Sequence, residues 1–193
     1  IAVTGSNGKT TTKEMTAHIL SRKFKVLKNE GTKNNQIGLP LTLLKLNSSY
    51  DIAVLEVGTN HFGEVDYLTK VCQPNMGIII NIGPSHLEYL GDLGGVFREK
   101  YKIIENLEKP YIGILNADDD LLKRKIFIKS GKVIILGFGI KDHCDFSAPG
   151  LRNFNDKIEF CVNQKYKFTL KTLGYYNIYN ALAAIIVARI FCI

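Results

Sequence analysis

Cysteine is scarce in the sequence, and the few cysteines follow no metal-binding or redox pattern. The 193 residues include four, which lie far apart: Cys72, Cys144, Cys161 and Cys192. They form no C-x-x-C pair, and no histidine stands at metal-ligand spacing from them. Neither a zinc site nor a redox motif is predicted, and we expect a reducing, cytoplasmic setting.

Long apolar runs and long charge runs are also missing. A membrane span needs roughly 18 to 20 uninterrupted apolar residues. The nearest candidate, "ALAAIIVARIFCI", is shorter and is interrupted by Arg189. We therefore expect a soluble protein with no membrane span. The net charge of +7 favours anionic partners, but the basic residues are scattered. Charge alone suits a nucleotide as well as it suits a nucleic acid. For the protein as a whole we expect no nucleic-acid partner and a monomer.

The composition and the ends of the sequence bear on domain organisation. With 46% hydrophobic and 22% charged residues, the chain fits one globular domain, residues 1–193, with a sizeable core. Residue 1 falls inside an apolar strand and residue 193 inside an apolar helix. We expect the chain to be a piece of a longer polypeptide.

Strand-like apolar runs alternate with helix-like segments through the first 140 residues. The runs are "IAVT", "KVLK", "DIAVLEV", "MGIIINI", "YIGILNA" and "KVIILGF". The alternation predicts an α/β fold of the P-loop NTPase type, a mostly parallel sheet with helices on both faces. Residues 142–174 predict a small antiparallel β appendage, and a final helix from about Asn177 is expected to return to the sheet.

A glycine-rich loop follows the first strand and precedes a helix. It consists of seven residues: Gly5, Ser6, Asn7, Gly8, Lys9, Thr10 and Thr11. Backbone N–H groups in such a loop face an anion, a lysine reaches the outer phosphates, and a threonine hydroxyl is offered to Mg²⁺. The motif is the shorter G-x-x-G-K-T form, because Val3 stands where the standard loop has glycine or alanine. A chance glycine turn is the alternative, but the strand–loop–helix context favours phosphate binding.

Two further chemical groups are expected at the carboxyl edge of the sheet, where ligands of such folds bind. Glu56 ends the third strand and could hold Mg²⁺ directly or through water, or it could be a solvated glutamate. His86 follows the fourth strand, and structural and functional roles are equally open for it. Asn60 and His61 lie in the loop after Glu56 and could be plain turn residues.

A lysine is expected to point inward from the segment "DLGGVFREKYKIIENL". One helical face carries Lys100 together with six apolar residues: Leu93, Val96, Phe97, Ile103, Ile104 and Leu107. Arg98, Glu99 and Lys102 are expected to point outward. A buried ammonium must be neutralised, paired or extended to solvent. Carbamylation by CO₂ would turn it into a metal-binding carboxylate. Alternatively, the stem packs on the core and the head reaches a phosphate or Glu56.

In their order, the motifs resemble those of a known family. "GSNGKTT", "KNNQIGLPLTLL", "EVGTNHFGEV", "NIGPSHLEYLGDLGGVFREK", "NADDD" and "GYYNIYNALAA" are similar to the central, ATP-binding domain of the Mur ligases of peptidoglycan synthesis. The resemblance spans nearly the whole chain. "NNQIGLP" and "E-x-G-x-N-H-x-G-E" point to the members that add D-alanyl-D-alanine.

The resemblance implies roles for individual residues. Residues 5–11 would bind the phosphates of ATP, with Thr10 on Mg²⁺. Glu56, His86 and a carbamylated Lys100 would serve two metal sites, and catalysis would depend on Lys9, His86 and Lys100. Four residues would lie near the muramoyl substrate: Asn34, Asn35, Asn60 and His61. Asn177 and Asn180 would lie near adenine, although Tyr176 stands where the family usually has histidine.

The resemblance also implies a reaction and a larger protein. The γ-phosphoryl group of ATP would pass to a carboxylate of UDP-N-acetylmuramoyl-tripeptide, and D-alanyl-D-alanine would attack the acyl phosphate. Amino- and carboxy-terminal domains, absent here, would complete the enzyme, so the chain alone is expected to bind nucleotide without ligating. The alternatives are a sister Mur ligase or folylpolyglutamate synthetase, a P-loop kinase or GTPase, which the missing N-K-x-D motif disfavours, and a non-catalytic module.

Overall fold

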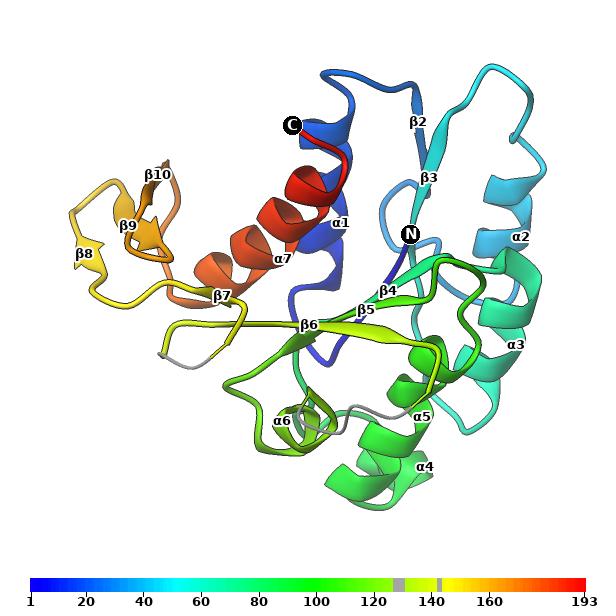
Figure 1. Cartoon of the computed structure of the whole chain (residues 1–193). Coiled ribbons are helices and arrows are strands. Elements are labelled where there is room, and N and C mark those ends of the chain that lie inside the picture. The colour runs from blue at the N-terminus through cyan, green and yellow to red at the C-terminus, as the bar shows by residue number, and fades with distance from the viewer. Residues whose placement is uncertain (127–130, 142–143) are drawn as a thin grey trace.

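Parallel strands and helices alternate along most of the chain in the computed structural model, which describes residues 1–126, 131–141 and 144–193 (Figure 1). The described residues form a seven-stranded sheet in the order β2-β3-β1-β4-β5-β6-β7. Its strands are β1 (Ala2–Thr4), β2 (Val26–Lys28), β3 (Ile52–Glu56), β4 (Met76–Ile79), β5 (Ile112–Asn116), β6 (Ile134–Gly139) and β7 (Phe146–Ser147). Every neighbouring pair is parallel. The expected sheet is confirmed.

Helices cover both faces of this sheet. They are α1 (Lys9–Leu20), α2 (Gly38–Leu43), α3 (Glu64–Cys72), α4 (Leu87–Leu90), α5 (Leu93–Glu105), α6 (Asp120–Ile126) and α7 (Tyr176–Ile190). Helices α1 and α7 lie side by side on one face, and α3 and α5 pack together on the other (Figure 1). The final helix therefore returns to the sheet, as expected.

The strand sequences explain why both faces are covered. Successive side chains of a strand point to opposite faces. Val3 packs in the core under α1 and α7, whereas its neighbour Ala2 packs in the core under α3 and α5. Ile78 and Ile79 of β4 divide in the same way. Unbroken apolar runs thus supply two cores, which is typical of a parallel sheet between helices.

The antiparallel appendage is smaller than expected. It consists of β8 (Arg152–Asn153), β9 (Ile158–Val162) and β10 (Tyr166–Leu170), in the order β10-β9-β8. Phe146, expected in the appendage, instead pairs with Phe138 as part of the main sheet. The beginning of the predicted span, residues 142–143, lies outside the described residues. Side chains of β9 are buried alternately, which attaches the appendage to the core near α7.

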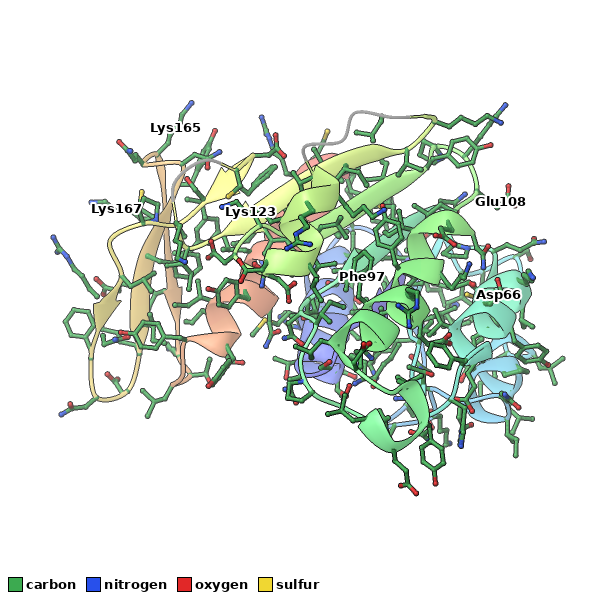
Figure 2. The ribbon with its side chains drawn as sticks, turned by 90° about the horizontal axis from the view of Figure 1, so that it is seen from below. Asp66, Phe97, Glu108, Lys123, Lys165 and Lys167 are labelled. Atoms are coloured by element: carbon green, nitrogen blue, oxygen red, sulfur yellow. The ribbon has the colours of Figure 1, made fainter. Side chains whose placement is uncertain are left out.

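The surface at the two ends of the molecule is charged. Lys165 and Lys167 project from the appendage, and Asp66 and Glu108 mark the opposite end (Figure 2). Among the described residues, no helix has the length and apolarity needed to cross a membrane.

Candidate functional site

The glycine-rich loop joins β1 to α1 and has the geometry of a phosphate-binding loop. Gly8 caps α1 with a φ of 82°, in the left-handed region that favours glycine. A Cβ atom at this position would collide with Oδ1 of Asn180. Within the described part of the chain no side chain caps the start of α1, so its first N–H groups remain for an anion, at the positive end of the helix dipole.

Hydrogen bonds hold this loop to the segment that follows β4. The Oγ of Ser6 donates to the carbonyl of Gly83 at 2.8 Å and accepts from the N–H of Gly83 at 2.9 Å. The N–H of Asn7 donates to Oδ1 of Asn81 at 2.9 Å, and Nδ2 of Asn81 donates back to the carbonyl of Asn7 at 3.2 Å. The loop therefore has a fixed shape.

Lys9 lies across the loop with its ammonium group at the open side. Its Nζ donates to the carbonyls of Gly5 at 2.9 Å and Ser6 at 3.3 Å. Partial burial lowers the pKa of Lys9, and the nearby carboxylate of Glu56 opposes that shift. A polyanion bound here would replace these carbonyls as the partner of the ammonium group.

A pocket of about 330 Å³ opens beside the loop. It is lined by Ser6, Asn7, Gly8, Lys9, Thr10, Thr11, Thr32, Asn34 and Glu56. Eight of these nine residues were expected at the site from the sequence. Thr32 was missed, because it belongs to no recognisable phosphate motif.

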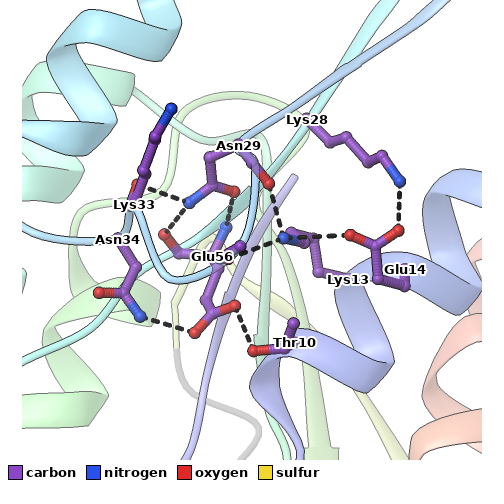
Figure 3. A network of polar contacts seen from close by, with 9 residues as sticks. Thr10, Lys13, Glu14, Lys28, Asn29, Lys33, Asn34 and Glu56 are labelled. Atoms are coloured by element: carbon purple, nitrogen blue, oxygen red, sulfur yellow. Dashed lines mark hydrogen bonds and ion pairs between the residues drawn. The ribbon is translucent and has the colours of Figure 1, made fainter.

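Glu56 is the acidic group of this pocket. Its side chain is 1% exposed, and its two carboxylate oxygens have different partners (Figure 3). Oε2 accepts from Oγ1 of Thr10 at 2.8 Å, and Oε1 accepts from Nδ2 of Asn34 at 2.6 Å. A carboxylate and a hydroxyl beside a phosphate loop form the oxygen-donor set that suits Mg²⁺, so these residues fit the ion.

Lys100 is buried as the helical period predicts. It is 1% exposed, and no hydrogen bond or ion pair of its Nζ occurs within the described part of the chain. Burial, reinforced by repulsion from Lys9, lowers the pKa of Lys100 to about 8, against a weaker opposing influence of Glu99. A buried amine with this pKa is mostly charged at pH 7, but its neutral fraction, about one tenth, is far larger than that of an ordinary lysine.

His86 begins α4 in a left-handed conformation, with a φ of 53°. Partial burial lowers the pKa of His86, and the positive charges of Lys100 and Lys9 lower it further. The same charges therefore act on His86, which is exposed, and on the phosphate loop, and the role of this histidine at the site stays a prediction. Among the described residues, no three His, Cys, Asp or Glu side chains gather as a metal-binding group.

The expectation that Glu99 points outward is wrong. Its side chain is 3% exposed and accepts hydrogen bonds from the backbone N–H groups of Gly63 at 2.9 Å and Val65 at 2.8 Å. These are otherwise unpaired donors at the start of α3. The helical periodicity of α5 separates apolar from polar positions, but it cannot show that a polar side chain will meet the start of another helix. Leu93 also departs from the expected face, because it is exposed.

Asn60 and His61 lie at the surface of the turn before α3. Their N–H groups donate to Oε2 of Glu64 at 2.6 and 3.1 Å. The ring of His61 lies against Tyr89, with 4.1 Å between ring centroids. The backbone of both residues therefore has a structural role, while their side chains face outward and remain predicted substrate contacts.

The other predicted asparagines have partners within the chain. Oδ1 of Asn35 accepts from two N–H groups at the start of α2. Asn180 is buried, accepts from Oγ1 of Thr12 at 3.1 Å and donates to Oδ1 of Asn177 at 3.2 Å. Asn180 thus supports the phosphate loop from below, and a contact of either residue with adenine remains a prediction.

Comparison with known proteins agrees with this geometry. Residues 3–188 match the family model described as "Mur ligase middle domain". The UDP-N-acetylmuramoyl-tripeptide--D-alanyl-D-alanine ligase of Haemophilus influenzae is 40% identical over 194 residues, which cover 95% of this chain and 41% of that protein. The chain thus spans about two fifths of the length of the curated relatives it matches.

Solved structures give the same result. MurF from Acinetobacter baumannii superposes with a TM-score of 0.91 at 34% identity, covering 100% of this chain and 42% of that one. MurF ligase from Thermotoga maritima in complex with ADP has a TM-score of 0.86 at 29% identity, covering 99% of this chain and 45% of that one. By its sequence match and its fold, the chain belongs to the Mur ligase family, as a middle domain.

Proposed function

We propose that this chain is the ATP-binding domain of a ligase that joins D-alanyl-D-alanine to UDP-N-acetylmuramoyl-tripeptide. The observation that carries the proposal is the position of Glu56, hydrogen-bonded to Thr10 directly beside the phosphate loop. The relative of known structure that was solved with ADP has the same fold. The relative that is 40% identical bears the name of this ligase.

The proposed reaction must bring two anions together. A carboxylate oxygen of the peptide attacks the γ-phosphorus of ATP, the bond to the β-phosphate oxygen breaks, and ADP leaves. The amine of D-alanyl-D-alanine then attacks the acyl carbon, loses a proton and releases inorganic phosphate. Lys9 and the N-terminus of α1 offset the negative charge of the transferring group.

Magnesium would be held by Thr10 and Glu56, with the remaining ligands supplied by phosphate oxygens and water. The ion, when bound, supplies positive charge that stabilises the phosphoryl group in the transition state of its transfer. Asn34 holds the second oxygen of Glu56 and thereby fixes the orientation of the carboxylate. Burial, followed by the charges of Lys100 and Lys9, lowers the pKa of His86 and so favours its neutral ring, the form that binds a metal, and we propose it as a ligand of a second cation.

Lys100 is proposed to carry a carbamate. The neutral amine is the form that attacks CO₂, and the lowered pKa of about 8 increases its fraction. The nitrogen forms a bond to the carbon of CO₂ and loses a proton to solvent, so the product is an anion where the unmodified chain has a buried cation with no described hydrogen-bond partner. That change removes the repulsion from Lys9 and provides a ligand for a second magnesium ion.

The remaining parts of the enzyme are proposed to lie in flanking domains. This chain covers 41% of the H. influenzae relative, so amino- and carboxy-terminal domains would hold the UDP group and close over the amine. We expect residues 1–193 alone to bind nucleotide without forming an amide bond. The reaction is placed in the cytoplasm, where ATP is available.

The test is phosphate release by the full-length protein with ATP, Mg²⁺ and both substrates, omitting each component in turn. Release that needs both the tripeptide and D-alanyl-D-alanine supports the ligase. Release that needs a single amino acid instead indicates a sister ligase, and release without any acceptor amine contradicts the proposal. Lys9→Ala should abolish release and weaken ADP binding, whereas Lys45→Ala, at an exposed lysine, should do neither. Unchanged ADP affinity in Lys9→Ala would indicate a non-catalytic module.

A further inference from the structure

Lys13 is a fully buried lysine whose charge the proposed reaction does not use. Its side chain is 0% exposed, and Nζ donates to the carbonyls of Asn29 at 2.6 Å and Gly31 at 3.3 Å. It also pairs with the carboxylate of Glu14 at 3.2 Å. Burying an ammonium group is costly unless it is paired and hydrogen-bonded. Lys13 therefore holds the segment that contains Asn29 and Gly31 against α1.

Asn29, whose carbonyl Lys13 binds, is in turn hydrogen-bonded through its side chain to the backbone of Glu56. The Oδ1 atom of Asn29 accepts from the N–H of Glu56 at 2.8 Å, and Nδ2 donates to the carbonyl of Glu56 at 3.1 Å (Figure 3). Strand β2 ends at Lys28, so the Asn29 side chain continues the pairing with β3 for which no backbone partner remains. Nδ2 also donates to the carbonyl of Lys33 at 2.9 Å, which shapes the turn before Asn34.

Helix α1 thus holds Glu56 at two points. Thr10 and Lys13 are three residues apart and lie on the same face of the helix. Thr10 contacts the carboxylate of Glu56 directly, and Lys13 acts on its backbone through Asn29. With both points in place, neither the position nor the direction of the carboxylate is free to change relative to the phosphate loop.

The outer side of the network keeps Lys13 neutralised. Glu14 is bonded to both Lys13 and Lys28. Although burial alone would raise the pKa of Glu14, hydrogen bonds from Lys28 and Lys13 outweigh it, and the pKa is lowered. Glu14 therefore stays ionised. Lys28 is exposed and contacts neither Asn29 nor Glu56 through any described hydrogen bond.

We infer that Lys13 and Asn29 are positioning residues, which hold the Glu56 carboxylate in register with the phosphate loop and couple it to the turn that bears Asn34. The inference rests on the proposed function for its consequence at the magnesium site. Neither residue touches the reacting atoms. Removing a residue that orients a metal ligand without touching the metal costs about 10-fold to 100-fold in metal affinity.

The first experiment needs no ligand, so it is independent of the proposed function. Amide hydrogen exchange is followed by NMR in the chain and in Lys13→Met, with Lys28→Met as the matched control that removes an exposed charge from the same network. We expect the Glu56 amide to exchange about tenfold faster in Lys13→Met, the factor expected from one lost hydrogen bond. The Leu115 amide in β5 should be unchanged, as should both amides in Lys28→Met.

Asn29→Leu provides a second variant in case Lys13→Met loses stability everywhere. It keeps the approximate size but removes both the Oδ1 acceptor and the Nδ2 donor that hold the backbone of Glu56, so it too should loosen Glu56 while leaving Leu115 unchanged. Equal acceleration at Glu56 and Leu115 in both variants would overturn the inference in favour of a general role in stability. Unchanged exchange at Glu56 in both variants would overturn it as well.

The second experiment reports the consequence for the cation. ADP binding is measured by calorimetry with Mg²⁺ and with EDTA. Lys13→Met and Asn29→Leu should keep the affinity measured in EDTA within about twofold and lose about tenfold or more of the gain that Mg²⁺ provides. An equal loss in both buffers would contradict positioning of Glu56. If the unsubstituted chain bound no ADP, the proposed function would be contradicted. The hydrogen-exchange data would still test whether Lys13 and Asn29 hold Glu56 in place.

Discussion

The carboxylate of Glu99 caps the helix that begins near Val65, although the two residues are 34 positions apart. Glu99 lies on α5 and reaches the backbone N–H groups at the start of α3, including that of Val65 at 2.8 Å. The contact joins the two helices that cover one face of the sheet. It also holds in place the residue that precedes Lys100.

Replacing Glu99 should destabilise the fold. Glu99→Ala leaves two backbone donors at the start of α3 unpaired, and we expect the free energy of unfolding to fall by about 2 kcal/mol. Urea unfolding measures the change. Glu105→Ala, which removes an exposed partner of Lys102, is the control and should cost less than about 0.5 kcal/mol. Equal midpoints for the two variants would show that the cap contributes nothing.

A comparison of Gly8 with Gly63 distinguishes two reasons why replacing a glycine lowers stability: strained backbone conformation and steric collision of the added Cβ. Both precede helices in the left-handed region, with φ values of 82° and 87°. A Cβ at Gly63 meets nothing within 4 Å, whereas one at Gly8 meets the buried Asn180.

We expect Gly63→Ala to cost about 1 to 2 kcal/mol from conformation alone, and Gly8→Ala to cost at least about 1 kcal/mol more from overpacking. Only Gly8→Ala should abolish ADP binding. The two unfolding curves and one binding titration provide the comparison, and equal stability losses would contradict it.

Because the pKa of Lys100 is lowered by folding, we expect the free energy of unfolding to depend on pH. The pKa is about 8 in the folded chain and 10.5 ordinarily. Below pH 8 the lysine is charged in both states, and the cost of burying it is constant. Between about pH 8 and 10.5 mainly the unfolded chain holds the proton, so the free energy of unfolding should rise with pH, by about 3 kcal/mol in all.

This rise should be missing in Lys100→Met and present in Lys123→Met, at an exposed lysine. The measurement is urea unfolding of the chain across this pH range, in carbonate-free buffer without Mg²⁺, so that the free amine is compared. Parallel pH profiles for Lys100→Met and the unsubstituted chain would show that burial of the charged Lys100 does not cause the pH dependence.

Tyr179 connects α7 to the loop after β5. Its hydroxyl donates to Oδ2 of Asp118 at 3.0 Å, and the same oxygen accepts from the N–H of Ile140 at 2.7 Å. Burial, followed by the charge of Asp118, raises the pKa of Tyr179. We expect Tyr179→Phe to lower the free energy of unfolding by about 1 kcal/mol. Thermal unfolding measures this, with the exposed Tyr67→Phe as a control that should be unchanged.

The sequence predicted the part of the site that depends on regular geometry. Parallel strands end at one edge, so Glu56 could be placed beside the phosphate loop once an ordinary strand order was assumed, and the structure has β3 next to β1. Helical period placed Lys100 inside for the same reason. Both are repeating patterns, and both can be read without knowing what the element packs against.

The parts that were missed depend on contacts between elements. Glu99 was placed outside because its partners belong to another helix. Asn29 carries no motif, and its role appears only when the end of β2 is seen to leave Glu56 without a backbone partner. Lys13 could have been found, since it lies three residues after Thr10 on one helix face, but nothing in the sequence showed that this face meets a loop.

The bonds between Asn7 and Asn81 have a consequence for the energetics of recognition. A flexible glycine loop would have to be ordered around its ligand, and the lost conformational entropy would subtract from affinity. Here that ordering takes place when the chain folds, because Asn81 already holds the loop by both of its side-chain atoms. The loop is preorganised, so more of the energy of each phosphate contact is available for binding.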